Sequence, residues 1–167
     1  ALYLGVSFFS YYLHKTLAAV NAIESFRYRI IGDEVYIFDQ INASATVLRE
    51  DQTFGFSLME YHEDAIQFSE IVKNEIARIQ TATGLFTRKE YGENLIHFSA
   101  MPWIDFTSFS HARSFTWPDS CPKISFGKMM ENNGKKTMPM SVHVHHGLMD
   151  GYHVSLFIDE FQKQMDA

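Results

Sequence analysis

The sequence predicts a single domain of mixed α and β structure. Apolar residues recur at helical spacing over residues 63–80 and again from about residue 152, and the stretch 6–23 is apolar on most faces. Short runs rich in β-branched and aromatic residues separate these helical stretches, as is typical of strands. The 167 residues contain no internal repeat and no linker, so we expect one domain that covers residues 1–167.

The first half of the chain predicts a helix, a hairpin, a strand and a second helix. The hairpin spans residues 26–39, where two β-prone runs flank a turn at Gly32-Asp33. Residues 45–49 predict a strand, whereas 53–60 fit no single pattern. The helix over 63–80 is the most regular element, with an apolar face made of Ala65, Ile66, Phe68, Ile71, Val72, Ile76 and Ile79.

The second half predicts a strand, an irregular connector, a long hairpin and a final helix, over residues 94–101, 106–122, 123–146 and 152 onward. The connector is rich in serine and is a candidate substrate loop. The two strands of the hairpin, 123–130 and 137–146, are joined by a turn at 131–135.

Composition limits the classes of partner. Apolar residues make up 46% and aromatic residues 15% of the chain, which is enough for a sizeable core and favours buried surface beyond that of one monomer. The net charge is -6 and the basic residues form no block, so we expect no nucleic-acid partner. No apolar run is long enough to span a membrane.

The chain is expected to work in the cytoplasm. Its one cysteine, Cys121, forms no internal disulfide and gives no sign of an oxidising compartment. The opening residues lack the positive start and the cleavage site of a signal peptide. The chain begins without methionine and inside an expected helix, which suggests that an N-terminal segment is missing.

The pattern HHxxxDG, from His145 to Gly151, is the main candidate for chemistry. His146 is expected to end its strand, where a side chain is held rigidly but remains open in front, and its reference pKa near neutrality suits a general base. Strand alternation places His143 and His145 on one face and His146 on the other, so at most one of the adjacent histidines acts directly. Asp150 could orient the imidazole or pair with a cation that holds the loop.

Two other interpretations of these histidines stay open. Lone histidines are often structural, and four fixed positions make a short motif. A metal site is the more specific alternative, because several potential ligands are close in sequence: His143, His145, His146, Asp150 and His153. However, the sequence has no HExxH pattern, no helical histidine pair and no cysteine ligands to support that site.

Ser99 is the second candidate for a direct role. Its hydroxyl lies on the predicted strand shortly before Pro102, where it could donate a hydrogen bond to a developing oxyanion. A half-buried strand serine is the plainer interpretation. No GxSxG surrounds any serine, and no GxGxxG or phosphate-binding loop pattern occurs, so serine hydrolases and nucleotide-binding proteins are disfavoured.

Two segments together resemble the chloramphenicol acetyltransferase family of coenzyme A-dependent acyltransferases. They are VHVHHGLMDGYHVSLFIDEFQ and SAMPWIDFTSFSH. ESFRYRIIGDEVYIFD and TFGFSLMEYHED resemble further blocks of the family in the same order, so the similarity covers essentially the whole chain.

The resemblance implies a two-layer α/β sandwich, a mixed sheet with helices packed on one face. It also implies a homotrimer whose active sites lie at subunit interfaces, with acetyl-CoA as co-substrate and a small-molecule alcohol as acceptor. We expect no bound metal, because the two adjacent histidines are expected on opposite faces of their strand and could not both bind one ion. His146 matches the general base of the family, Ser99 its oxyanion-stabilising serine, and Asp150 an aspartate that braces the loop through an arginine. That arginine belongs to the segment expected to be missing here.

Four further residues are implied to contact substrates. Phe54 and Phe86 fall where aromatic residues line the acceptor pocket, and Ser125 lies where the family usually has a threonine near the reaction centre. Lys128 is followed by Met129 where members often have tyrosine, so contacts with coenzyme A are expected to differ.

The sequence therefore predicts an enzyme that transfers an acetyl group from acetyl-CoA to the hydroxyl of a small molecule. Chloramphenicol is the leading acceptor, which would make the protein an antibiotic-resistance enzyme. One alternative is the acyltransferase core of a 2-oxo acid dehydrogenase complex, although no lipoyl domain or Pro/Ala-rich linker occurs in the sequence. The other is a catalytically silent trimeric homologue that binds coenzyme A or a small molecule.

Overall fold

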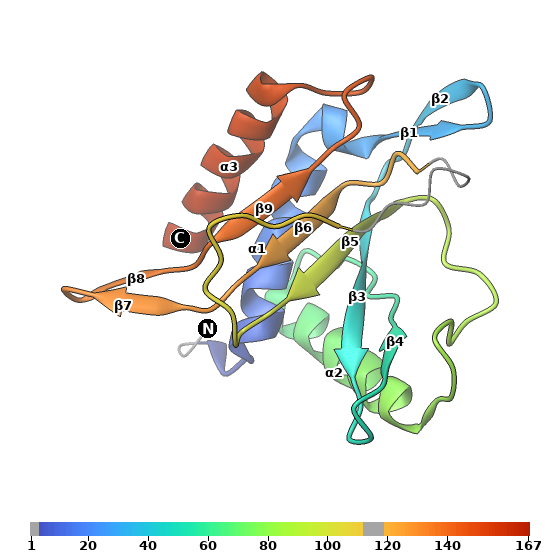
Figure 1. Cartoon of the computed structure of the whole chain (residues 1–167). Coiled ribbons are helices and arrows are strands. Elements are labelled where there is room, and N and C mark those ends of the chain that lie inside the picture. The colour runs from blue at the N-terminus through green and yellow to red at the C-terminus, as the bar shows by residue number, and fades with distance from the viewer. Residues whose placement is uncertain (1–3, 112–118) are drawn as a thin grey trace.

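The computed structural model describes residues 4–111 and 119–167 and has two layers, a mixed sheet and helices on one of its faces (Figure 1). The main sheet has the strand order β4-β3-β5-β6-β9. Its strands are β3 (Asn42–Leu48), β4 (Phe54–Phe56), β5 (Leu95–Ala100), β6 (Lys123–Phe126) and β9 (Met140–His143). The helices are α1 (Phe8–Ala22), α2 (Ala65–Thr81) and α3 (Gly151–Asp166). This arrangement confirms the predicted fold class.

The central strands β3, β5 and β6 are parallel, while β4 and β9 run antiparallel at the two edges. Because side chains alternate along a strand, this register divides the sheet into two faces. One face carries Ala45, Phe98 and Ile124, which are buried in the core beneath the helices. The other, which we call the open face, carries polar side chains and is described with the site.

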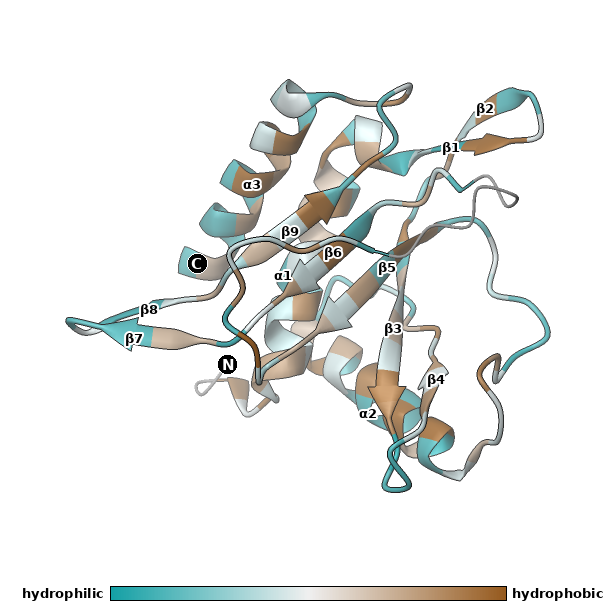
Figure 2. Ribbon diagram, in the orientation of Figure 1, coloured by the Kyte–Doolittle hydropathy of each residue, from teal (hydrophilic) through white to brown (hydrophobic). Residues whose placement is uncertain are grey.

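The helices use their apolar sides to cover the sheet. α1 contacts both α2 and α3 and supplies fully buried side chains such as Leu13 and Leu17. On α3, Phe157 stacks on Phe26 and Phe161 packs on Phe126. Hydrophobic and hydrophilic residues alternate along α2 and α3 in Figure 2, as expected for helices with one solvent-facing side.

Most predicted elements are confirmed within about three residues. The helix expected over 63–80 is α2, which begins after Asp64, whose carboxylate accepts hydrogen bonds from the amides of Ile66 and Gln67. The hairpin expected over 26–39 is β1 (Tyr28–Ile31) and β2 (Glu34–Ile37), and Gly32 supplies the positive φ of +63° that its turn requires. The ambiguous stretch 53–60 contains β4.

The long hairpin expected over 123–146 is wrong in one respect, because it is two separate ladders. β6 pairs with β9 in the main sheet, and β7 (Met130–Asn132) pairs with β8 (Lys135–Thr137) in a projecting ribbon. The break falls at Pro139, which has no amide proton to donate to a ladder and only accepts a hydrogen bond from the Gly127 amide.

The expectation that His146 ends a strand is also wrong. β9 ends at His143, and the chain then folds into a turn in which the amides of Leu148 and Met149 both point to the carbonyl of His145. Strand alternation therefore does not determine where the side chains of His145 and His146 point.

Two short segments of the chain are not described by the structure. Residues 112–118, within the connector expected over 106–122, lie outside the described residues, as do residues 1–3. In the described part of the chain, the helices are too short or too polar to cross a lipid bilayer.

Candidate active site

The HHxxxDG loop is built on the start of α3. Asp150 is the N-cap of this helix, and its carboxylate accepts hydrogen bonds from the amides of Tyr152 and His153. The His153 Nδ1 lies 2.8 Å from the same carboxylate oxygen. The hydrogen bonds from the His153 side chain and amide, joined by the Tyr152 amide, lower the pKa of Asp150. Asp150 is therefore a charged anchor of the loop, paired within the described residues to His153 rather than to an arginine.

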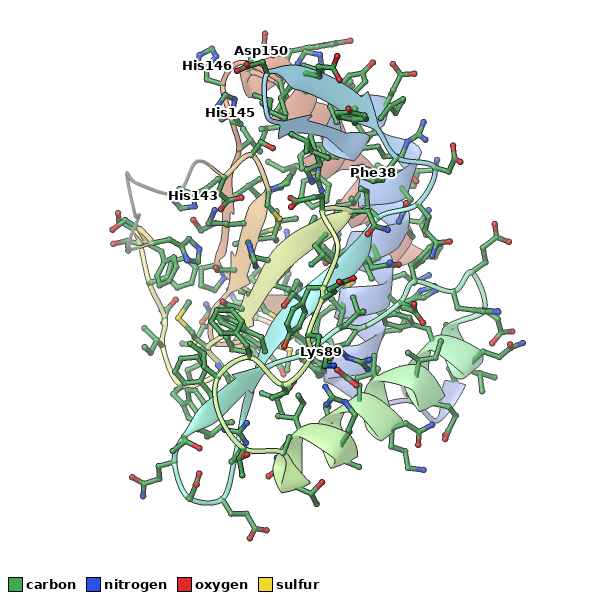
Figure 3. All side chains as sticks on the ribbon, turned by 90° about the vertical axis from the view of Figure 1, so that its right-hand side faces the viewer. Phe38, Lys89, His143, His145, His146 and Asp150 are labelled. Atoms are coloured by element: carbon green, nitrogen blue, oxygen red, sulfur yellow. The ribbon has the colours of Figure 1, made fainter. Side chains whose placement is uncertain are left out.

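The two adjacent histidines have different surroundings. His145 is half-buried, and its Nδ1 accepts a hydrogen bond from the Gly147 amide at 3.2 Å. A methyl group on Gly147 would come within about 3.1 Å of that ring, so the glycine lets the loop close on His145. His146 is exposed and projects from the same end of the molecule as Asp150 (Figure 3). His146 is therefore free to meet a ligand or another protein surface.

A row of serines crosses the open face of the sheet. Ser99 on β5 is the register partner of Ser125 on β6, which is in turn the partner of Ser141 on β9. Ser99 is half-buried and Ser125 is fully buried. Register partners on neighbouring strands point the same way, so the three hydroxyls share one face. The structure thus brings together Ser99 and Ser125, two of the residues singled out in the sequence.

Aromatic side chains continue this row toward the other edge of the sheet. Phe56 on β4 pairs with Thr46 on β3, and continuing the β3–β5 register by one residue places Thr46 beside Ser99. The rings of Phe54 and Phe86 lie 6.1 Å and 5.5 Å from that of Phe56. Phe54 and Phe86 therefore lie together on the open face, and Phe56, which the sequence analysis did not single out, joins them.

The connector after β5 returns across the open face over β6 and β9 (Figure 1). The Lys128 amide donates to the carbonyl of Ile104, which ties the start of the connector to the end of β6, while the Lys128 side chain is exposed. Further along, His111 places its Nε2 3.1 Å from the hydroxyl of Ser125. A cavity of about 400 Å³ lies beside this contact, with His111, His143 and His145 among its lining residues.

His111 is the polar residue of the site that sequence reasoning missed. Its ring meets that of His143 edge-on at 5.3 Å, and His143 contacts Ser141 at 3.3 Å. Burial and the neighbouring His143, Lys123 and His97 lower the pKa of His111, so its imidazole is neutral at physiological pH. His111 ends the segment SAMPWIDFTSFSH, but a single histidine in an irregular connector does not indicate a role by itself, because only the fold brings it to the serine row.

His146 and Ser99 are not brought together within one chain. The register aligns His143 with Lys123 and His97, about 7 Å along the strands from the serine row. His146 lies three residues beyond His143, past the end of β9 and away from Ser99. One copy of the chain therefore presents the two groups at different places on its surface.

The described residues do not gather the histidines near Asp150 into a metal site. The grouping with suitable geometry is instead His97, Asp119 and Cys121, whose potential ligand atoms lie within 4.8 Å of one another. Lys123 already pairs with Asp119, and burial raises the pKa of the Cys121 thiol to about 12. Both features oppose a cation at this position.

Comparison with known proteins identifies the family of the chain. The family model for chloramphenicol acetyltransferase matches residues 4–162. A chloramphenicol acetyltransferase from Klebsiella is 31% identical over 160 residues, which cover 95% of this chain and 73% of the relative. Chloramphenicol acetyltransferase 3 of Escherichia coli is 31% identical over 158 residues, with coverages of 93% and 74%.

Solved structures give the same relationship. A chloramphenicol acetyltransferase superposes with a TM-score of 0.86 at 30% identity, covering 95% of this chain and 77% of the other. A dihydrolipoamide acetyltransferase from Azotobacter vinelandii superposes with a TM-score of 0.68 at 12% identity, covering 95% and 69%, a likeness of fold alone. The chain is thus an acetyltransferase that belongs to the chloramphenicol acetyltransferase family.

Proposed function

We propose that this enzyme transfers the acetyl group of acetyl-CoA to a hydroxyl of a small molecule, with chloramphenicol as the leading acceptor. The family match over residues 4–162 supports the reaction class. The observation that carries the proposal for this chain is the HHxxxDG loop, in which Asp150 anchors the start of α3 and leaves His146 exposed. An exposed imidazole on an anchored loop suits a base that must reach a bound alcohol.

In the proposed reaction, a neutral His146 nitrogen removes the proton of the acceptor hydroxyl as its oxygen attacks the thioester carbonyl. The negative charge develops on the carbonyl oxygen, where the Ser99 hydroxyl donates a hydrogen bond. When the intermediate collapses, the C–S bond breaks and the coenzyme A thiolate takes the proton from His146. The ester is released, no acyl group is ever bound to the protein, and the scheme uses no metal ion.

The site is proposed to be completed by a second copy of the chain in a homotrimer. His146 and Ser99 lie apart on one copy. With β6 between the two strands, the last residue of β9, His143, is level with His97 on β5, whereas Ser99 lies nearer the other end of β5. Rotation about a three-fold axis can bring His146 of one subunit to Ser99 of the next. Phe54, Phe56 and Phe86 would then line the acceptor side of the site, and Lys128 the side of coenzyme A.

A thiol-release assay tests the proposal directly. Purified protein is given acetyl-CoA with chloramphenicol, with a panel of other alcohols, or with dihydrolipoamide, and free coenzyme A is measured. We expect release that depends on chloramphenicol or a related alcohol. Turnover with dihydrolipoamide alone would support the dehydrogenase-core alternative, and binding of acetyl-CoA without release under any condition would support a silent homologue.

A further inference from the structure

We propose that His111 is a positioning residue of this active site and fixes the direction of the Ser125 hydroxyl beside Ser99. The inference rests on the proposed function, because it assigns His111 a part in the same reaction. It adds a residue from the connector to a site otherwise built from the sheet and the HHxxxDG loop.

The contact itself is specific. The Nε2 of His111 lies 3.1 Å from the Oγ of Ser125, and Ser125 is fully buried in the middle of the serine row. A hydroxyl has one proton and can rotate, so a partner at hydrogen-bond distance restricts its direction: the proton points to the partner when the hydroxyl donates and away from it when the hydroxyl accepts. In the described part of the chain, His111 is the side-chain partner that the structure gives to Ser125.

The imidazole is itself held in place. The ring of Phe109 packs edge-on against His111 at 4.8 Å, and His143 packs edge-on at 5.3 Å. Burial disfavours a proton on His111 and lowers its pKa, and the nearby His143, Lys123 and His97 act in the same direction. Asp119 and Cys121 line the same cavity. A neutral imidazole has one donor and one acceptor nitrogen, so its tautomer determines whether Ser125 donates or accepts.

The consequence for the reaction follows from the neighbouring strand. Ser99, the proposed oxyanion donor, is the register partner of Ser125. The direction of the Ser125 hydroxyl therefore determines whether a donor or an acceptor faces Ser99. Groups that point correctly before the reaction need not reorganise in the transition state, and this raises kcat rather than affinity. His111 therefore acts through Ser125 and need not touch the substrate.

A double-mutant cycle distinguishes this role from a merely structural one. The variants are His111→Phe, which keeps an aromatic ring, Ser125→Ala, and the two combined. We expect each single variant to lower kcat about tenfold, the double variant to lose no more than either, and both KM values to change by less than about twofold. His111→Gln, whose amide reaches a similar position, should recover most of the activity, and His62→Phe, on the approach to α2, should match the wild type.

Several outcomes would overturn the inference. These are a fully active His111→Phe protein, or losses that multiply in the double variant. If His111→Phe does not fold, nitrogen NMR of the His111 imidazole in the wild type and in Ser125→Ala still provides a test. It should show one tautomer in the wild type and a mixture in Ser125→Ala. A mixture in the wild type would contradict the proposal. Wild-type protein that shows one tautomer but no acetyl transfer would instead refute the proposed function.

Discussion

At the scale of single residues, Asp150 combines two tasks that are usually separate. Its carboxylate caps α3 through two backbone amides and pairs with the His153 side chain. The same residue fixes where the loop ends, so its position determines where His146 projects. The cap needs only an oxygen acceptor, whereas a hydrogen bond between the His153 ring and this oxygen is stronger when the oxygen belongs to a charged carboxylate.

Asp150→Asn is expected to separate these two tasks. Asparagine is as good an N-cap as aspartate, so the melting temperature should change little, whereas kcat should fall because the link to His153 is weakened. Asp150→Ala should lower both kcat and the melting temperature. Steady-state kinetics and thermal unfolding of the two variants check this, and unchanged kcat in Asp150→Asn would refute a bracing role for the charge.

The two adjacent histidines should respond differently to truncation. We expect His146→Ala to lower kcat by about 10²–10⁴-fold, the usual contribution of a positioned general base, with no loss of thermal stability, because the side chain is exposed. His145→Ala should lower the melting temperature instead, because His145 is half-buried and closes the loop on Gly147. An active His146→Ala enzyme would rule out the proposed base.

At the scale of elements, α2 holds the segment that carries Phe86. Glu75 on α2 is only 5% exposed and binds Arg78, Arg88 and the Leu58 amide. Burial alone would raise the pKa of Glu75, but these hydrogen bonds outweigh it, and the pKa falls to about 2. Arg88 lies two residues after Phe86, so the cluster fixes the aromatic end of the open face to the helix.

This cluster predicts a particular dependence of stability on pH. Because the folded pKa of Glu75 is depressed, its contribution is complete above the unfolded value of 4.5 and is lost as the pH falls toward 2. Glu75→Gln should lower the free energy of unfolding by about 2 kcal/mol at pH 7 and by less at pH 3. Urea unfolding of both proteins at the two pH values measures this, and an equal loss at both would contradict it.

Elements with a clear hydrophobic period or turn signal were predictable from the sequence, whereas the points at which strands are interrupted or end were not. The apolar stripe of α2 and the Gly32-Asp33 turn are local signals, so both were predicted correctly. The interruption at Pro139 and the early end of β9 depend on which carbonyls and amides meet across the fold. The same limit applies to the site, since the motif pointed to His146 and Asp150, whereas His111 was found only through its contact with Ser125.

At the scale of the whole molecule, several large apolar side chains are exposed to solvent on the single chain. Leu48, Phe54, Phe86, Trp103, Ile104 and Met129 are all more than 40% exposed. Phe86 and Trp103 reach 71% and 70%. Exposed apolar surface of this kind is typical of an interface between protein chains.

We therefore expect a trimer in solution. Light scattering coupled to size-exclusion chromatography should give about three times the chain mass of 19.3 kDa at micromolar concentration. Trp103→Glu, which places a charge on the exposed apolar surface, should shift the protein toward monomers and lower activity in parallel. A wild-type monomer with full activity would contradict a site shared between copies.

The distance between His146 and Ser99 on one chain has a genetic consequence. If every site takes its base from one subunit and its oxyanion donor from the next, then two inactive alleles, His146→Ala and Ser99→Ala, can rescue each other. Co-expressed in equal amounts and mixed at random, they should regain about one quarter of the wild-type activity, because half the subunits supply each intact group. Mixing the purified trimers without exchange of subunits should restore nothing. A bacterium that carries both defective copies would then show activity that neither copy provides alone.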